Sequence, residues 1–337
     1  MNILITGGVG FIGTNCALYF GKNKKNKITI IDNFSRSGVE KNAQYLKKNI
    51  QVKIIRADVN EINKYLNSLK KADVVIHLAG QTAVTTSIKK PHLDFRSNLS
   101  GTFKLLEAVR KNNPKTIVLY SSTNKVYGDL KNHRLKKDLI NKKYIDVGCP
   151  KGIDEKERID FISPYGCSKG AVDFYFQDYA RIYNLQTVVF RQSCIYGPHQ
   201  IGVEDQGWVA HFVKQHLLKK PITIFGDGYQ VRDLLYVDDL IRAYERAIKN
   251  INRVRGKVFN VGGGIKNSYS LLQCIKTLKY MTKVTVSIKF KPARLGDQKY
   301  FVSDNEKIKK ILKWKPETKF TNGIKKLIAW QKDFYNL

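Results

Sequence analysis

A glycine-rich stretch near the start of the chain constrains the fold more than any other feature. The sequence TGGVGFIG, residues 6–13, joins a short apolar run to a segment with helical character. It fits G-x-G-x-x-G from Gly8 and G-x-x-G-x-x-G from Gly7. Glycines permit the tight turn and let the backbone approach a pyrophosphate at a helix N-terminus. Such turns also serve plain packing, so the stretch needs support from its surroundings.

Two carboxylates supply that support. Asp32 ends a second predicted strand, 19 residues after Gly13, where it can accept hydrogen bonds from an adenosine ribose. A carboxylate at that position repels a 2′-phosphate, which favours NAD over NADP, although the nearby Arg36 keeps NADP open. Asp58 ends the third predicted strand and is placed to reach the adenine. Together these features predict a dinucleotide-binding half.

The first half of the chain alternates strand and helix patterns. Alternation of this length predicts parallel strands with helices on both faces of the sheet, an α/β fold. The polar segment 129–162 is expected to be a long loop at the carboxyl edge of that sheet. The predicted strands are 2–6, 27–32, 52–58, 72–79, 115–123 and 187–191, and the predicted helices include 61–70 and 93–112.

After about residue 197 the pattern changes to shorter, mixed elements, such as 222–225, 233–237, 257–261 and 284–290. This change predicts a smaller C-terminal α+β lobe packed on the first. We assign residues 1–197, with part of the chain after 230 returning, to the nucleotide-binding domain. Residues 198–337 are then mostly a substrate-binding lobe.

A second motif is YGCSK, which places Tyr165 and Lys169 four residues apart after Pro164. On a helix this spacing puts both side chains on one face. An ammonium group beside a phenol favours the phenolate, and so does a bound nicotinamide cation. The pair therefore predicts a tyrosine base, in a protein whose fifth strand also ends in Ser121, Ser122 and Thr123.

Charge and composition exclude several other classes of protein. The net charge of +32 suits a nucleic-acid binder, but the basic pairs are spread over the whole length and form no basic tail. The five cysteines form no CxxC pair and the six histidines show no metal-ligand spacing, so we expect reduced thiols and no metal. No apolar stretch approaches a membrane span, and the first residues do not resemble a signal peptide. A cytoplasmic protein with no membrane contact and no specific nucleic-acid partner is predicted.

Several ordered motifs resemble the extended short-chain dehydrogenases/reductases, which include nucleotide-sugar epimerases and dehydratases. They are TGGVGFIG, HLAGQ (77–81), SST (121–123), YGCSK, RQSCIYGP (191–198), QVRDLLYVDD (230–239), FNVGGG (259–264) and PARLGD (292–297). The resemblance covers nearly all of the chain. It implies a Rossmann-type NAD domain, a C-terminal lobe that holds a nucleotide diphospho-sugar, and a homo-oligomer.

The resemblance also implies roles for single residues. Thr123, Tyr165 and Lys169 would form the catalytic triad. The residues implied to contact NAD are Gly7, Gly10, Phe11, Ile12, Gly13, Asp32, Asn33, Asp58, Val59, Leu78, Ala79, Gly80, Asn98, Tyr165 and Lys169. Those implied to contact substrate are Gln81, Thr123, Gln206, Arg232 and Arg294, with the two arginines on the diphosphate. A surface ion pair with Asp233 or Asp297 is the alternative for either arginine.

Within that family the chain most resembles epimerases that act at C2 of a CDP-linked deoxysugar, on the segments STNKVYGDL, EDQGWVAHF and 152–175. The alternatives are 4-epimerisation of a UDP-hexose, 4,6-dehydration, and a non-catalytic NAD- or nucleic-acid-binding protein. Dehydration needs an acid and a base after the hydroxyl residue, but Asn124 and Lys125 stand there. Cys194 occupies a position where many nucleotide-sugar epimerases carry a phosphate-binding Asn, so transfer of 4-epimerase contacts is in doubt.

Overall fold

The computed structural model describes residues 1–337, and its centre is a seven-stranded sheet. Every neighbouring pair in this sheet is parallel. The strand order reverses between β1 and β4, and in sheets of this kind ligands bind at the carboxyl ends beside such a reversal. In spatial order the strands are β12 (Val258–Val261), β8 (Gln186–Gln192), β5 (Ile117–Thr123), β4 (Val74–His77), β1 (Asn2–Thr6), β2 (Lys27–Asp32) and β3 (Val52–Arg56).

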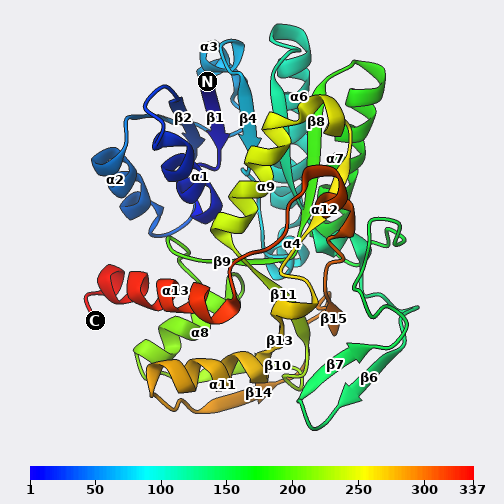
Figure 1. Ribbon diagram of the computed structural model, residues 1–337. Helices are drawn as coiled ribbons and strands as arrows, with labels where there is room; N and C mark the ends of the chain where they lie inside the picture. The colour runs from blue at the N-terminus through cyan, green and yellow to red at the C-terminus, as the bar shows by residue number, and fades with distance from the viewer.

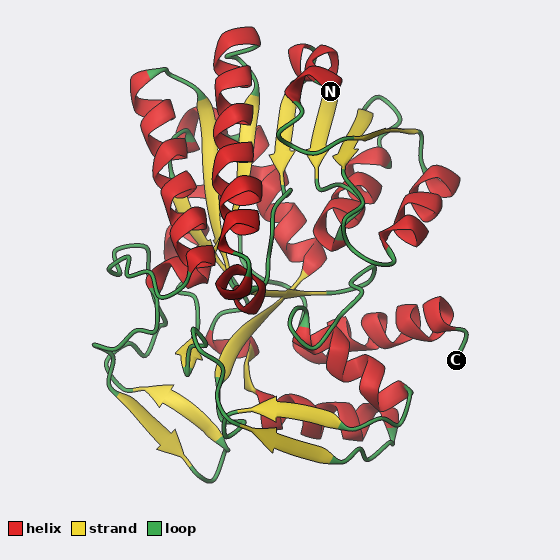
Figure 2. Cartoon of the chain, turned by 180° about the vertical axis from the view of Figure 1, so that it is seen from behind, coloured by secondary structure: helices red, strands yellow, loops and turns green.

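Helices cover both faces of this sheet, as Figures 1 and 2 show from opposite sides. In β1 the side chains alternate, so that Ile3 and Ile5 enter one apolar core and Leu4 enters the other. The first face carries α1 (Phe11–Gly21), α2 (Val39–Asn49) and α9 (Val237–Lys249), and the second carries α3 (Leu66–Lys70), α6 (Gly101–Asn112) and α7 (Pro164–Ile182). The predicted doubly wound Rossmann-type fold is confirmed.

A smaller lobe of short strands and helices lies below the carboxyl edge of the sheet in Figure 1. Its strand β11 (Val231–Tyr236) pairs with β9 (Cys194–Tyr196), β13 (Ser268–Ser270) and β15 (Tyr300–Phe301), while β10 (Ile222–Phe225) pairs with β14 (Ile288–Lys291). Around them lie α8 (Trp208–Leu217), α11 (Leu271–Thr282) and α13 (Phe320–Tyr335), and the short η4 (Ile265–Asn267) contacts β11. The short helices α10 (Ile251–Val254) and α12 (Glu306–Leu312) contact α9 and the large sheet, α10 at β8 and α12 at β12. Strand β12 and helix α9 return to the large sheet, whereas the domain boundary at residue 197 stays a prediction.

Three predicted elements differ from the structure. The predicted loop 129–162 contains an antiparallel pair, β6 (Leu135–Asp138) and β7 (Lys143–Asp146), whose lysine-rich sequences hide the strand pattern. The predicted helix 93–112 is divided into α5 (Pro91–Asp94), a π-helical turn η2 (Phe95–Ser100) and α6. The predicted helix 61–70 is shortened to η1 (Ile62–Lys64) and α3. The wider π turn matters for the site because it carries Asn98.

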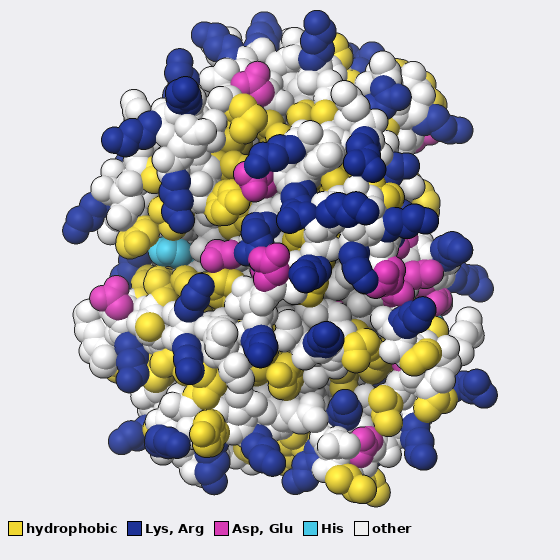
Figure 3. Space-filling view, viewed as in Figure 1, with side chains coloured by type: hydrophobic (Ala, Val, Ile, Leu, Met, Phe, Trp, Pro, Cys, Tyr) yellow, Lys and Arg dark blue, Asp and Glu magenta, His cyan; other side chains and the backbone are white.

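Positive charge is distributed over the visible surface, and no single basic patch stands out in Figure 3. Lysine and arginine side chains occur over both lobes in that view, with acidic side chains between them. This distribution agrees with the interpretation of the +32 charge as solvated surface. No helix in the structure has the length and apolar character required to cross a membrane.

Candidate active site

The turn between β1 and α1 has the geometry of a pyrophosphate cradle. Gly7 has φ +68°, and a Cβ there would lie 2.8 Å from the backbone nitrogen of Ala79. A Cβ on Gly13 would lie 2.5 Å from the Gly7 carbonyl oxygen. No side chain caps α1, whose N-cap is Gly10, so the first-turn N–H groups, including those of Phe11 and Ile12, are left for an anion. These residues fit the phosphates of NAD.

The two predicted acids lie at the carboxyl ends of neighbouring strands. Asp32 accepts hydrogen bonds from the backbone N–H groups of Val9, at 3.1 Å, and Phe34, at 2.9 Å. Burial raises the pKa of Asp32, and those two hydrogen bonds oppose the rise. Asp58 accepts from the Asn33 amide at 3.0 Å and from Asn60. These hydrogen bonds lower the pKa of Asp58 in spite of the opposing effect of burial, so it stays ionised.

The β4 end of the crevice supplies a buried acceptor. The Asn98 amide donates to the Gln81 carbonyl and to Asp94, at 2.9 Å, while its oxygen Oδ1 is buried with no partner in the protein. A Cβ on Gly80 would lie 2.3 Å from that oxygen, so only glycine fits beside it. An unpaired buried carbonyl is costly, and a donor from a bound cofactor would satisfy it. Of the other predicted contacts, Leu78 and Ala79 directly follow β4 and Val59 follows β3, and their contact with NAD stays a prediction.

The predicted triad comes together where β5 and α7 meet. Thr123 is the last residue of β5, and Tyr165 is in the first turn of α7, which Ser163 caps by accepting from the Gly166 N–H. Lys169 follows one turn later and donates from Nζ to the Ser121 carbonyl at 2.8 Å. Tyr165 and Lys169 are both buried. Their roles in catalysis stay predictions.

Burial shifts the pKa of both ionisable members of the triad. Burial raises the pKa of Tyr165 to about 12, although a hydrogen bond with Thr123 opposes the rise. Burial also lowers the pKa of Lys169 to about 8. The Lys169 ammonium donates to the Ser121 carbonyl and forms no hydrogen bond with the Tyr165 hydroxyl. A positive charge close to the phenol, such as that of an oxidised nicotinamide, would favour the phenolate.

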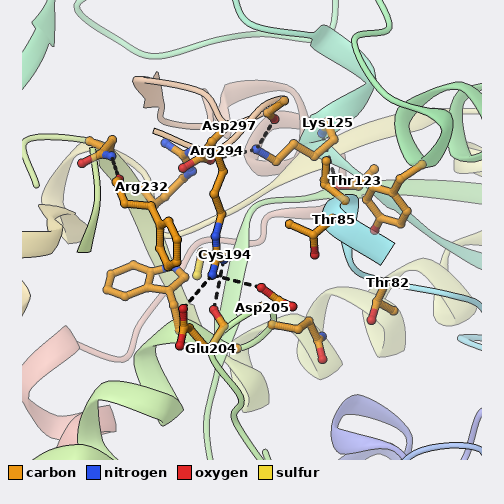
Figure 4. Close-up of a pocket in the computed structure, with 18 of the residues that line it drawn as sticks. Thr82, Thr85, Thr123, Lys125, Cys194, Glu204, Asp205, Arg232, Arg294 and Asp297 are labelled. Carbon is orange, nitrogen blue, oxygen red and sulfur yellow. Dashed lines mark hydrogen bonds and ion pairs between the residues drawn. The ribbon is translucent and has the colours of Figure 1, made fainter. Parts of the chain in front are cut away.

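A cavity of about 270 Å³ opens beside Thr123 and Tyr165 and extends into the smaller lobe. Arg232 and Arg294 line it (Figure 4), and so does Gln206, while their role as substrate contacts stays a prediction. The Gln206 amide oxygen accepts from Arg36, which reaches over from the β2 side. Gln81 does not line this cavity, and its amide nitrogen donates to the Ala83 carbonyl at 2.6 Å. Its role as a substrate contact stays a prediction.

Each of the two arginines is already paired with acidic side chains. Arg294 lies 3.2 Å from Glu204 and 3.0 Å from Asp205, and its guanidinium stacks on Phe225. Arg232 forms an ion pair with Asp297 at 2.7 Å, the alternative that the sequence left open. The carboxylates at 204 and 205 were not predicted. The only available signal was an acidic pair next to Gln206 in a basic protein.

The positions that distinguish reactions within the family also face the cavity. Asn124 donates to the Gln298 side chain at 3.1 Å, and Lys125 pairs with Asp297 at 3.3 Å. No carboxylate stands at the positions that directly follow Thr123. Burial raises the pKa of the Cys194 thiol to about 12, so it stays protonated and adds no charge that would repel a phosphate.

His133, Asp146 and Cys149 gather near the β6–β7 pair and resemble a metal-ligand set. However, both ring nitrogens of His133 are engaged by carboxylates, with Nδ1 2.5 Å from Asp146 and Nε2 2.9 Å from Glu157. Burial lowers the pKa of His133, but these two hydrogen bonds outweigh it and raise the pKa above its ordinary value. This arrangement favours an ion pair, and the expectation of no metal stays a prediction.

Residues 3–262 match the NAD dependent epimerase/dehydratase family, and the chain belongs to that family. The predicted class, an NAD-dependent nucleotide-sugar epimerase, is confirmed by its relatives. The chain is 42% identical to CDP-paratose 2-epimerase from Salmonella typhi, over 98% of this chain and 99% of that protein.

Solved structures agree with this assignment. UDP-glucuronic acid 4-epimerase from Bacillus cereus, in complex with UDP-glucuronic acid and NAD, has a TM-score of 0.85 and 28% identity, covering 99% of this chain and 100% of that one. UDP-glucose 4-epimerase from Thermotoga maritima, with UDP-glucose, has a TM-score of 0.83 and 30% identity, with the same coverage. NAD is therefore the cofactor.

Proposed function

We propose that this protein epimerises CDP-paratose at C2 to give CDP-tyvelose, or acts on a close analogue, by transient oxidation of the sugar. The observation that carries the chemistry is that Thr123 and Tyr165 line the same cavity as Arg232 and Arg294. The reacting carbon and the cytidine base rest on the full-length similarity to the Salmonella typhi enzyme.

The protein's own groups move the proton. Tyr165, as phenolate, removes the proton from the sugar 2-hydroxyl, and the C2–O bond becomes a carbonyl. Thr123 hydrogen-bonds the reacting oxygen and orients it. After the keto sugar has turned over in the cavity, Tyr165 returns the proton to the same oxygen. NAD held by the turn at Gly7 and Gly13, with Asp32 and Asn98 beside it, would supply the reversible hydride transfer that oxidation and reduction at C2 require.

The arginines hold the diphosphate through this cycle. A guanidinium group binds phosphate oxygens through two parallel N–H bonds. Glu204, Asp205 and Asp297 orient these cations, and the substrate phosphates compete with them for the guanidinium protons. The diphosphate is then the fixed point about which the keto sugar turns.

The second candidate is 4-epimerisation of a UDP-hexose. It is supported by the 30% identity to the Thermotoga maritima enzyme solved with UDP-glucose. Dehydration is disfavoured because Asn124 cannot transfer a proton and Lys125 is a cation. The resemblance also suggests a cytoplasmic homo-oligomer, a dimer or tetramer, that serves lipopolysaccharide or surface polysaccharide synthesis, and these parts of the proposal rest on the resemblance alone.

Incubation of the protein with CDP-paratose and with UDP-glucose, in separate reactions read by NMR, tests the proposal. We expect an equilibrium mixture of C2 epimers from CDP-paratose and no product from UDP-glucose. Conversion of UDP-glucose to its C4 epimer, with CDP-paratose unchanged, would support the second candidate and contradict the first.

A further inference from the structure

Lys125 occupies an unusual place beside the reacting groups. It is the second residue after Thr123, in the 3-10 turn η3 (Asn124–Tyr127), and its backbone N–H donates to the Thr123 hydroxyl oxygen at 3.2 Å. Its side chain is 16% exposed and lines the substrate cavity (Figure 4). The same turn therefore presents the predicted reacting hydroxyl and an ammonium group to one cavity.

The charge around Lys125 is only partly compensated. Its Nζ lies 3.3 Å from Oδ1 of Asp297, and that same oxygen accepts from Nη2 of Arg232 at 2.7 Å. Two cations thus share one carboxylate, which leaves one positive charge facing the cavity. Burial lowers the pKa of Lys125 to about 8 in spite of the opposing effect of Asp297, as expected for an ammonium that lacks a full counter-charge.

Neighbouring contacts hold this cluster in place. Lys125 also donates to the Gly296 carbonyl at 3.4 Å, and Asn124 donates to the Gln298 side chain at 3.1 Å. These contacts join the turn after β5 to the segment 296–298 of the smaller lobe. A row of contacts therefore leads from the predicted reacting hydroxyl to an arginine that is predicted to hold the diphosphate. Its members, in order, are Thr123, Lys125, Asp297 and Arg232.

In a nucleotide sugar, the distance from the β-phosphate to the reacting carbon depends on which carbon reacts. The β-phosphate is attached through oxygen to C1, so C2 is the ring carbon next to the phosphate-bearing carbon. C4 lies across the ring from C1 and is therefore farther from the β-phosphate. An enzyme that places C2 against Thr123 and Tyr165 must hold the β-phosphate close to Thr123, whereas an enzyme that presents C4 holds it farther away. A cation two residues after Thr123 suits the first arrangement.

We propose that Lys125 is a specificity-determining residue whose ammonium binds the sugar-linked β-phosphate and so sets C2 opposite Thr123 and Tyr165. This inference rests on the proposed function at C2. Arg232 holds the phosphate from the other side of Asp297, and Arg294 lines the same cavity.

The test measures nucleotide binding by calorimetry, because CDP carries the β-phosphate and CMP lacks it. Lys125→Met keeps much of the side-chain volume and removes the charge. We expect it to weaken CDP binding about 10- to 100-fold, the loss for one charge-assisted hydrogen bond, with CMP binding changed less than about twofold. Lys125→Arg should recover most of the CDP affinity. Lys131→Met, at a lysine that is 76% exposed, is the matched control.

UDP and UMP are measured in the same way, so that the identity of the base does not decide the outcome. Equal affinities of wild type and Lys125→Met for the diphosphates would overturn the proposal. An equal loss for diphosphates and monophosphates would also overturn it, since this would indicate a disturbed Arg232–Asp297 pair. The kcat and KM of the variants on CDP-paratose form a second arm. A wild type that binds CDP through Lys125 but leaves CDP-paratose unchanged would contradict the function at C2 and leave the phosphate contact standing.

Discussion

The cofactor end and the substrate end of this site are built by different means. At the cofactor end, backbone geometry is decisive: Gly7 and Gly13 stand where a Cβ would collide, and the start of α1 carries no side-chain cap. At the substrate end, Arg232 and Arg294 are held by carboxylates across a cavity between the lobes. The glycine turn that fits the pyrophosphate is one continuous segment of the sequence. The arginines and carboxylates at the substrate end come from distant segments and meet only in the folded chain.

The largest effect is expected where the two ends meet. Replacing Tyr165 with Phe removes the proton acceptor while keeping the ring that packs in this buried position. We expect turnover to fall about 10²- to 10⁴-fold, the usual contribution of a general base. Epimer formation followed by NMR measures it, with circular dichroism as the control for folding, which should not change. A Tyr165→Phe protein of full activity would refute the assignment of the base.

The substitution Gly7→Ala is expected to impair NAD binding at the cofactor end and to leave the substrate end unchanged. The added Cβ would meet the backbone of Ala79 at 2.8–2.9 Å, and the φ of +68° disfavours any side chain. Strain of about 1–3 kcal/mol should weaken NAD binding roughly 5- to 150-fold, as measured by the NAD retained after gel filtration or by calorimetry. Gly148→Ala is the matched control, because its Cβ would approach no atom more closely than 3.5 Å. Unchanged NAD binding in Gly7→Ala would mean that this turn is not the cradle.

The substitution Arg294→Met is expected to impair binding of the nucleotide sugar and to leave the cofactor end unchanged. This change removes a guanidinium that faces the cavity but lies outside the reacting triad. We expect KM for the nucleotide sugar to rise about 10-fold or more, with a smaller change in kcat and none in NAD binding. Lys289→Met, an exposed lysine in the same lobe, should leave both constants unchanged. A fall in kcat at constant KM would instead place Arg294 in the chemical step.

The smallest effect is expected outside both ends, at His133. Its folded-state pKa is raised by Asp146 and Glu157, so the added stability is full below the unfolded pKa and is lost as pH rises through the folded one. His133→Asn should therefore lower Tm by about 2–4 °C near pH 5.5, and the difference should shrink at higher pH. The control is His92→Asn, at an exposed histidine that forms no ion pair. A Tm difference between wild type and His133→Asn that increases as the pH rises would contradict the ion pairs of His133 with Asp146 and Glu157.

The sequence predicted the strands around the cofactor end well because their signals are local. Strands 2–6 and 27–32, the glycine turn and Asp32 all lie within one β-α-β unit, and the structure has both strands at the predicted bounds. The π turn at 95–100 was not predicted, since its residues have ordinary helical character and tertiary contacts of Asn98 hold it. The acidic partners of Arg294 were missed because sequence spacing does not indicate which distant charges meet across a cavity.

The central claim is transient oxidation at C2, and substrate labelled with deuterium at C2 tests it most directly. Hydride removal and return by a bound cofactor should keep the label on C2 of the epimerised sugar, with no solvent deuterium incorporated when the reaction is repeated in D₂O with unlabelled substrate. Loss of the label to solvent would indicate proton removal from carbon, and would contradict the roles given to Tyr165 and to NAD.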